Sequence, residues 1–295
     1  MNLNQFTANG KFLMLALDHR GSIKKLINPE NPDSVSDEQV ISLKNEIIEA
    51  LRDQFSALLI DETWGFEACH EICQYKPFLL PVEKSGYMQD REQKVTELEY
   101  SVKQLMDMGA SGAKLLVYFN PNVESAEKQI ETTRKVMEEC KENDFPFFLE
   151  IVTYTPSENT SDTPGVSANG SSEPHTGSEQ DISGGNLVIE SVKKFIDSDV
   201  VPDVWKLEYP GSVEQSREIT NLVGSTPWIL LTGGHDFETF KSNLGNAVKA
   251  EASGFLAGRA LWQEVCKLDG EEKEKFLNET LPERFKTIAE IATKF

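Results

Sequence analysis

Residues 203–210 read DVWKLEYP, a short apolar run with a lysine inside it. Val204, Trp205 and Leu207 give the run the composition of a strand that is buried on both faces, as strands of parallel sheets are. Lys206 interrupts this pattern. Because a buried ammonium group must give up either its solvation or its charge, a lysine at this position needs a specific reason.

Similar apolar runs recur along the whole chain, and stretches with helical periodicity separate them. One predicted helix covers SDEQVISLKNEIIEALRD (36–53), where Ser36 or Asp37 can cap; another covers REQKVTELEYSVKQLMDMG (91–109) and ends at Gly109. A last helix is predicted near 280–293. The predicted strands are 11–17, 55–60, 77–83, 113–119, 146–154, 204–209, 228–234 and 254–260.

Eight strand–helix units within 295 residues, with strands too continuously apolar for a one-sided sheet, predict a closed (β/α)8 TIM barrel. An open doubly wound sheet is the alternative. No G-x-G-x-x-G motif follows the first strand, which weakens a dinucleotide-binding version of that alternative. We therefore expect residues 1–295 to form a single barrel domain.

Residues 155–185 break the rhythm of strand and helix. They are rich in Ser, Pro, Gly, Asn and Glu and hold almost no large apolar residue, which is typical of a flexible insertion. In a barrel this insertion follows the fifth strand, at the end where active sites form. The sequence leaves two interpretations open, a mobile lid over the site or a solvated insertion without a role.

Composition limits the classes of partner. The chain is 39% hydrophobic and 26% charged, as soluble globular proteins are, and its net charge of −20 disfavours nucleic acid and anionic membranes as partners. It contains no run of 18 apolar residues and no signal peptide at its start, so a cytoplasmic location is the default expectation. A homo-oligomer remains open.

The four cysteines, Cys69, Cys73, Cys140 and Cys266, are expected to be reduced thiols, because a disulfide framework is unusual in a chain of this size. The segment CHEIC (69–73) also admits a metal site, but no second ligand pair is evident, and core cysteines are the better interpretation. Only four histidines exist, His19, His70, His175 and His235. We therefore expect no metal.

Charged residues stand in or directly after several of the apolar strands. Buried charges are costly unless they are paired, and side chains on different strands can pair only if they converge on one axis, as they do inside a barrel. A single such residue could also be an exposed strand end or part of a core ion pair. The set comprises Asp18, Lys84, Lys114, Glu150, Lys206 and Arg259.

Within this set Lys206 is the candidate nucleophile. An amine attacks a ketone only when it is neutral, and both burial and a second nearby cation favour the neutral form. Lys206 meets both conditions if Trp205 and the apolar neighbours on its strand wall it and Lys114 lies near it. Glu150 is expected to move protons during Schiff-base formation, and Asp18 to orient or deprotonate a substrate hydroxyl.

The loops after the last two predicted strands predict an anion site. Backbone N–H groups there often hold a phosphate in barrels, and TGGHDF and GRALW place three glycines and an arginine at these positions. A glycine pair alone is more often a simple turn. The predicted substrate- and phosphate-binding residues are Arg20, Lys84, Thr232, Gly233, Gly234, Gly258 and Arg259.

In the order of its strand residues the chain resembles class I, Schiff-base sugar-phosphate aldolases, and most closely the tagatose 1,6-bisphosphate aldolase family, which includes sulfofructosephosphate aldolase-like members. The segments that carry the resemblance are ALDHRGS (16–22), EKSGY (83–87), AKLLVYFNP (113–121), FPFFLEIVTY (145–154), DVWKLEYP (203–210) and FLAGRALW (255–262).

The resemblance implies that Lys206 forms the Schiff base, that Glu150 is the acid/base, and that Asp18 and Lys114 flank the reacting carbons. It also implies a metal-free retro-aldol cleavage of a ketose phosphate to dihydroxyacetone phosphate and an aldehyde such as glyceraldehyde 3-phosphate. The chain departs from the family at His19, where Gln is typical, and at LTGGHD (231–236), where the family has a Ser-Ala-Gly-type turn.

Because these departures fall in substrate-contacting loops, the sugar stays open: tagatose 1,6-bisphosphate, sulfofructose 1-phosphate or another ketose 1-phosphate. Two other functions remain. A zinc-dependent aldolase would need more histidine ligands than the chain offers. A regulator that binds sugar phosphates without turnover would use the same pocket, although a pure binder gains nothing from a buried amine.

Overall fold

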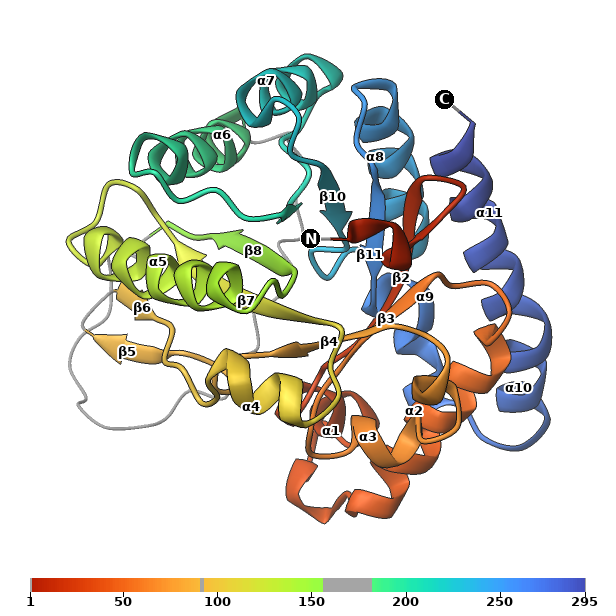
Figure 1. The fold of residues 1–295 in the computed structure, drawn as a ribbon. Coiled ribbons are helices and arrows are strands. Elements are labelled where there is room, and N and C mark those ends of the chain that lie inside the picture. Colours follow the sequence, from red (N-terminus) through yellow and green to blue (C-terminus); the bar gives the residue numbers. More distant parts are fainter. Residues whose placement is uncertain (1, 91–92, 156–181, 295) are drawn as a thin grey trace.

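The computed structural model describes residues 2–90, 93–155 and 182–294. Eight parallel strands in these residues close into a barrel, and helices surround it, so the predicted (β/α)8 architecture is confirmed (Figure 1). Around the barrel the strands are β2 (Lys11–Leu17), β11 (Gly254–Ala257), β10 (Trp228–Leu231), β9 (Val204–Leu207), β8 (Phe147–Thr153), β7 (Gly112–Phe119), β4 (Phe78–Pro81) and β3 (Ala57–Ile60), with β3 pairing back to β2.

Every predicted strand is present, but several end earlier than predicted, including the last three. Gly233 and Gly234 both have positive φ, 58° and 77°, and turn the chain away from the sheet after Leu231. Similarly, Arg259 begins a short helix instead of ending β11. Glycine adopts positive φ without steric cost, so these turns bring the backbone close to the barrel mouth.

The helices on the outside of the barrel follow the strands in sequence. Ser36 caps the second of them through a capping box with Gln39. The helices are α1 (Gly21–Ile27), α2 (Asp37–Leu51), α3 (Gly65–Ala68), α4 (Val102–Asp107), α5 (Ala126–Glu142), α6 (Ile182–Asp197), α7 (Val213–Val223), α8 (Phe237–Lys249), α9 (Arg259–Trp262), α10 (Gly270–Lys275) and α11 (Leu281–Thr293). Shorter turns are η1 (Leu3–Phe6), η2 (Pro32–Ser34), η3 (Ile72–Gln74), η4 (Gln263–Lys267) and the π-helical η5 (Phe276–Thr280).

The predicted helix over 91–109 is wrong over most of its length. Only Val102–Asp107 is helical, starting after the cap Ser101, and the chain before it forms an antiparallel hairpin of β5 (Met88–Asp90) and β6 (Gln93–Val95). Distant residues explain this. Thr96 donates through Oγ1 to the Leu116 carbonyl at 3.0 Å, and its N–H bonds to Gln129 at 3.2 Å. These contacts override the local helical periodicity.

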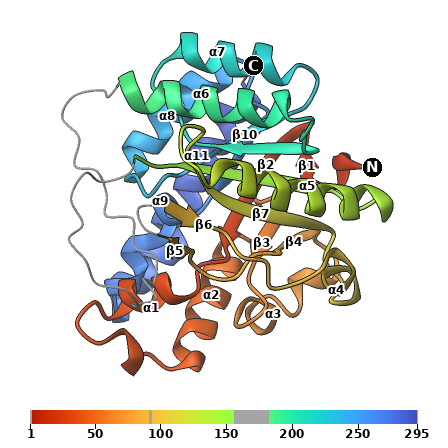
Figure 2. The same cartoon turned by 90° about the vertical axis from the view of Figure 1, so that its left-hand side faces the viewer.

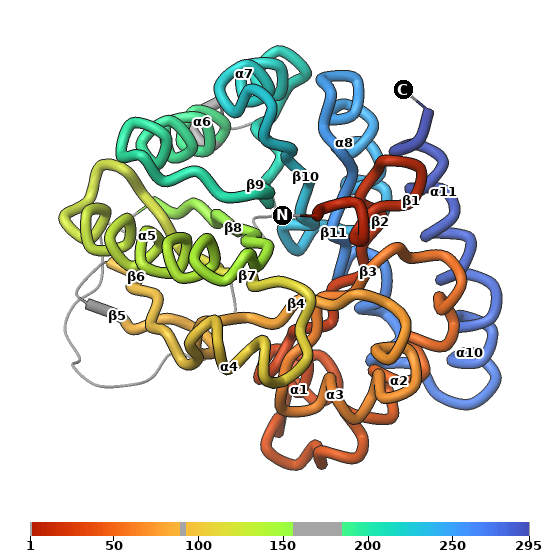
Figure 3. The backbone as a smooth tube through the Cα atoms, in the orientation of Figure 1, coloured from red at the N-terminus to blue at the C-terminus, as the bar shows by residue number. Residues whose placement is uncertain are grey.

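The barrel interior is apolar at the end where the strands begin. A cluster that includes Phe12, Met14, Leu59, Phe148 and Ile229 fills it. The short antiparallel strand β1 (Thr7–Ala8) and η1 lie across this end, so the N-terminal residues cross the barrel axis in Figure 3.

Phe6, on η1, closes the same end by packing edge-on to Phe148 at 5.2 Å between ring centroids. The absence of a side chain at Gly112 makes room for the Phe6 ring, because a Cβ at this position would lie 2.8 Å from a Leu79 methyl and 3.3 Å from Phe6. In the part of the chain that is described, apolar side chains therefore fill the barrel interior at this end, and the polar side chains lie toward the other end.

The expectation of four reduced thiols is wrong for one pair. Cys69, at the end of α3, and Cys73, in η3, form a disulfide, because one helical turn between them brings their Cα atoms to 5.7 Å. This also removes the alternative of a metal site on CHEIC. Cys140 and Cys266 are free, as predicted, and both are buried.

The predicted insertion at 155–185 falls largely on residues 156–181, which lie outside the described residues. Helix α6 begins at Ile182, so the last residues of the predicted insertion belong to a helix. The single-domain organisation stays a prediction. Among the helices described, none has the length and apolar character required to cross a membrane.

Candidate active site

The polar residues of the site lie on the same inward-facing side of the strands as the apolar residues of the barrel core, closer to the ends of the strands. Successive strand residues alternate between faces, so two residues beyond an inward apolar side chain the next one also points inward. On β8, Phe148 is followed in this way by Glu150, and on β9, Val204 is followed by Lys206. Glu150 and Lys206 are direct neighbours in the β8–β9 register.

Glu150 lies between two amines. Its Oε2 atom is 2.8 Å from Lys206 Nζ and 3.1 Å from Lys114 Nζ. The Lys206 side chain is buried, with the residue 4% exposed. The structure therefore brings together the three residues at the centre of the predicted site.

Lys114 is held by three carboxylates. Besides Glu150, it donates to Glu83 Oε1 at 2.6 Å and to Asp18 Oδ2 at 3.0 Å. Burial alone lowers the pKa of Lys114, but the charges of Glu150, Glu83 and Asp18 outweigh burial and raise that pKa well above its ordinary value. Lys114 is therefore a permanent cation.

The two lysines differ in how their charge is compensated. Among the described residues, Lys114 has three carboxylate partners, whereas Lys206 has one, which it shares with Lys114. Removing a proton from Lys206 leaves Glu150 still paired with Lys114, while removing one from Lys114 would leave three carboxylates facing a neutral amine. The carboxylate charge that surrounds Lys206 is thus smaller than the charge that surrounds Lys114.

The carboxylates themselves divide into two kinds. Burial raises the pKa of Glu150 and of Asp18, but the charges of Lys114 and Lys206 dominate, so both pKa values lie below their ordinary range. For Glu83 burial dominates and raises the pKa. One Glu83 oxygen, Oε2, is buried without a hydrogen-bond partner among the described residues.

The prediction that Trp205 walls the Lys206 amine is wrong. Trp205 points to the opposite face and packs against Phe195 outside the barrel. The inward neighbours of Lys206 are Val204 on its own strand and Ile229 across the register of β10.

The predicted anion site lies after β10 and β11. Thr232 is buried there, and a Cβ on Gly234 would lie 3.4 Å from Arg259 Nη2, so the glycine backbone closely approaches the guanidinium. Gly258 approaches the His19 ring in the same way, at 3.0 Å from Cε1. The Nε atom of Arg259 is buried without a partner in the part of the chain that is described.

Arg20 and Lys84 do not join this anion site. The guanidinium of Arg20 contacts Glu62 Oε1 at 3.3 Å and Glu99 Oε2 at 3.2 Å, and it donates to the Glu83 carbonyl at 2.9 Å. Lys84 has a 53% exposed side chain, 3.6 Å from Glu97. Arg20 thus holds the backbone of Glu83, whose carboxylate binds Lys114. Lys84 is exposed and lies away from these charged residues.

Several site residues were missed at the sequence level. Glu83 and Asp61 both continue an inward face, two residues beyond Pro81 and Leu59, and alternation counted from the apolar core would have found them. Asp61 forms a fully buried ion pair with Lys44 of α2, which also donates to the Leu17 carbonyl at 2.8 Å. No sequence pattern pointed to Lys44.

His19 follows Asp18 at the barrel mouth and packs edge-on to Trp262, 5.0 Å between ring centroids. Its Nδ1 atom lies 3.9 Å from Asp18 Oδ1. Burial, which outweighs the charge of Asp18, lowers the pKa of His19 to about 3. His19 is therefore neutral at physiological pH.

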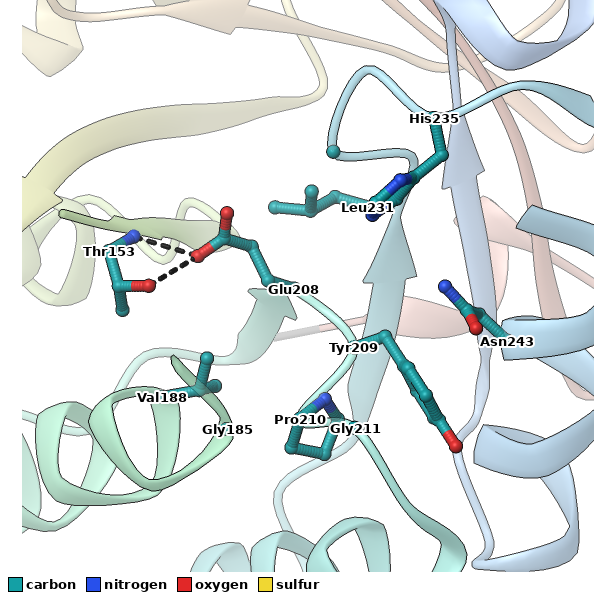
Figure 4. A pocket seen from close by; sticks show the side chains of 11 residues that line it. Thr153, Gly185, Val188, Glu208, Tyr209, Pro210, Gly211, Leu231, His235 and Asn243 are labelled. Carbon is teal, nitrogen blue, oxygen red and sulfur yellow. Dashed lines mark hydrogen bonds between the residues drawn. The ribbon is translucent and has the colours of Figure 1, made fainter. Parts of the chain in front are cut away.

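A pocket of about 190 Å³ lies between the ends of β8, β9 and β10 (Figure 4). Glu208 faces Thr153 in it and accepts hydrogen bonds from both the N–H and the hydroxyl of Thr153, each at 2.8 Å. Tyr209, His235 and Asn243 line other parts of the wall. Within the described residues, no group of three His, Cys, Asp or Glu side chains is arranged to hold a metal ion.

Comparison with known proteins gives one family. A family described as "DeoC/LacD family aldolase" matches residues 12–264. Tagatose 1,6-diphosphate aldolase 1 of Streptococcus mutans is 28% identical over 96% of this chain and 90% of its own.

Two solved structures share the fold. An archaeal fructose-1,6-bisphosphate aldolase with its catalytic lysine bound to the carbinolamine intermediate has a TM-score of 0.60 and 17% identity, covering 98% of this chain and 97% of that one. Fructose-bisphosphate aldolase of Plasmodium falciparum has a TM-score of 0.66 and 15% identity, covering 98% and 92%.

Proposed function

Since the chain belongs to the DeoC/LacD family of aldolases, we propose that it cleaves a ketose phosphate through a Schiff base on Lys206. One observation carries the proposal: a buried lysine shares a single carboxylate with a second lysine that is itself held by three. This arrangement favours one neutral amine beside one permanent cation.

The first step is a proton transfer from Lys206 to the Glu150 carboxylate, 2.8 Å away. The neutral amine then adds to the C2 carbonyl of the ketose, giving a carbinolamine. The protonated Glu150 returns its proton to the departing hydroxyl, which leaves as water, and an iminium ion forms. Lys114 stabilises the Glu150 carboxylate at the start and the end of this cycle.

Cleavage follows from the iminium ion. A carboxylate, Glu150 or Asp18, removes the proton of the C4 hydroxyl, the C3–C4 bond breaks, and its electron pair moves into the iminium to give an enamine. The aldehyde leaves. Protonation of the enamine at C3 and hydrolysis of the iminium release dihydroxyacetone phosphate and restore the Lys206 amine.

The phosphate on C1 is assigned to the turn that carries Thr232, Gly233 and Gly234, together with Gly258 and Arg259. Backbone N–H groups and an arginine are the partners that phosphate prefers. Tagatose 1,6-bisphosphate is the first candidate, because relatives such as the Streptococcus mutans protein carry that name. Sulfofructose 1-phosphate and other ketose 1-phosphates are the alternatives.

The chemistry proposed needs neither a metal nor an organic cofactor, because the iminium itself withdraws electrons from the bond that breaks. A cytoplasmic location belongs to the same proposal, since phosphorylated sugars are charged and do not cross membranes unaided. A regulator that only binds sugar phosphates is disfavoured, because the cost of burying the Lys206 amine would bring it no benefit.

The test is a cleavage assay coupled to detection of dihydroxyacetone phosphate, with tagatose 1,6-bisphosphate, fructose 1,6-bisphosphate and sulfofructose 1-phosphate offered in parallel. We expect turnover of at least one substrate by the native protein and none by Lys206→Ala. Binding of the same sugars without turnover would support the regulator, and full activity of Lys206→Ala would exclude the proposed nucleophile.

A further inference from the structure

Lys94, on β6, lies inside a cage of three tyrosines. Its Nζ atom is 4.8 Å from the centroid of the Tyr87 ring, 5.1 Å from Tyr118 and 5.3 Å from Tyr154. Across the described part of the chain, no carboxylate oxygen lies within ion-pair distance of this nitrogen, although acidic residues outnumber basic ones by 49 to 29. A partly buried lysine without a carboxylate partner is unusual in such an acidic chain.

The aromatic cage fixes the ammonium group without using its hydrogen-bond donors. Aromatic faces attract a cation through their quadrupole, and they do not replace the acceptors that an ammonium group binds through its three N–H bonds. Lys94 is therefore held in place, and among the described residues its ammonium group has no hydrogen-bond acceptor. An acidic oxygen of a ligand would complete its surroundings.

The three tyrosines around Lys94 border the mouth of the barrel, further toward the open end than Lys114 and Glu150. Tyr118 lies four residues beyond Lys114 on β7, and Tyr154 four residues beyond Glu150 at the end of β8. Four residues of strand span about 13 Å, so both tyrosines stand on the strands of the cluster, further toward the open end. Burial and then the charge of Glu150 raise the pKa of Tyr118 to about 12, in keeping with this proximity.

The strand that carries Lys94 is firmly attached to the barrel, where β6 lies beside β7 (Figure 2). The buried Gln129 of α5 donates to the Lys94 carbonyl at 3.3 Å and to the Tyr118 carbonyl at 3.1 Å. The N–H of Lys94 donates to the Tyr154 hydroxyl at 3.1 Å. The cation is thus preorganised, which reduces the entropy lost when a ligand binds.

The cage faces the assigned C1-phosphate site across the barrel. Around the ring of eight strands, β7 is four strands from β11 in either direction, so Tyr118 and Arg259 stand on opposite walls. Lys206 and Glu150, on β9 and β8, lie between these walls. A substrate with one anionic group at Arg259 and its C2 at Lys206 would extend its other end toward Lys94.

We propose that Lys94 binds a second anionic group, a phosphate or a sulfonate, on the half of the substrate that leaves as the aldehyde. This inference rests on the proposed function and narrows its substrate class to ketoses that carry an anionic group at both ends. Glu208 accepts both hydrogen bonds of Thr153 on one oxygen, and its charge also acts on Lys94, but burial outweighs that charge and lowers the pKa of Lys94.

The test compares three substrates with the native protein, Lys94→Met and Lys94→Arg. The substrates are tagatose 1,6-bisphosphate, tagatose 1-phosphate and sulfofructose 1-phosphate, which carry a phosphate, no charge and a sulfonate at the far end. A hydrogen bond to a charged group contributes about 1.5–3 kcal/mol, so we expect Lys94→Met to lose roughly 10- to 150-fold in kcat/KM on one or both doubly anionic substrates.

The loss should appear in KM, leave kcat little changed, spare tagatose 1-phosphate, and be partly restored in Lys94→Arg. The doubly anionic substrate that shows the loss identifies phosphate or sulfonate as the ligand. An equal loss of kcat/KM on all three substrates would mean that Lys94 has a purely structural role. No loss on any substrate would mean that Lys94 does not contribute to substrate binding. Either result overturns the inference.

Lys76→Met is the matched control. Lys76 also lies over an aromatic ring, 4.6 Å from the centroid of Phe55, but it precedes β4 at the apolar end of the barrel. It should show no difference between substrates. Failure of the proposed function would look different, because then no substrate would be cleaved by any variant and the inference would fall with it.

Discussion

Glu150 is the residue on which the proposed proton transfers depend, since one of its oxygens contacts both lysine amines. Replacing it in Glu150→Gln keeps the shape and removes the base. General acid–base catalysis contributes roughly 10²- to 10⁴-fold, so we expect kcat to fall by that factor while KM changes less. Steady-state kinetics checks this, with the exposed Glu138→Gln on α5 as control.

A Glu150→Gln enzyme that kept its kcat would assign the proton transfers to Asp18 or Glu83. Its melting temperature should be measured alongside, because Lys114 keeps two carboxylate partners in this variant and the fold should survive.

His19 gives a prediction about stability and pH. Its pKa falls from 6.5 to about 3 on folding, so between these values the unfolded chain holds a proton that the folded protein lacks. Stability from the neutral ring is complete above pH 6.5 and is lost as the pH falls toward 3. This single group adds up to about 1.4 kcal/mol per pH unit to the slope of the unfolding free energy.

In His19→Gln that contribution disappears, and the unfolding free energy should depend less steeply on pH. Urea unfolding at several pH values between 7 and 4 measures the slope. An unchanged slope would mean that His19 is protonated in the folded protein.

At the scale of elements, the segment from α3 to η3 carries the clearest difference from the sequence expectation. If Cys69 and Cys73 form a disulfide, titration of the denatured, unreduced protein should find two thiols, Cys140 and Cys266, and four after reduction. Four thiols before reduction would restore the expectation of a fully reduced chain and agree with a reducing cytoplasm.

The β5–β6 hairpin shows why local pattern was insufficient. Residues 91–109 have helical periodicity, yet Gln129 and Leu116, distant in sequence, hold Thr96 in an extended segment. The donors and acceptors that decide this lie on α5 and β7. A reading of one segment at a time contains no information about them.

The strands, by contrast, are specified locally. Each is apolar on both faces, which only a sheet covered by helices outside and a core inside can satisfy. The same local signal located Asp18, Lys114, Glu150 and Lys206, because a charge inside such a run must face the axis to find partners. This signal gave a wrong prediction for Lys84, because the side chain that faces the barrel axis is that of the preceding residue, Glu83.

For the whole molecule, the barrel explains why residues so far apart in sequence meet. The parallel strands all end at one mouth of the barrel. Asp18, which follows the first barrel strand, and Lys206, on the sixth barrel strand along the chain, therefore reach the same Lys114–Glu150 pair. Ring closure between β2 and β3 makes this convergence independent of any loop. Partners contributed by helices and hairpins, such as Lys44 and Lys94, emerge only from the assembled fold.

The most direct test of the account is reductive trapping. Borohydride added during turnover of a cleaved ketose phosphate should reduce the iminium to a stable secondary amine, and mass spectrometry of the digested protein should find the adduct on Lys206 alone. An adduct on Lys114 or another lysine, or cleavage that continues with no adduct at all, would contradict it.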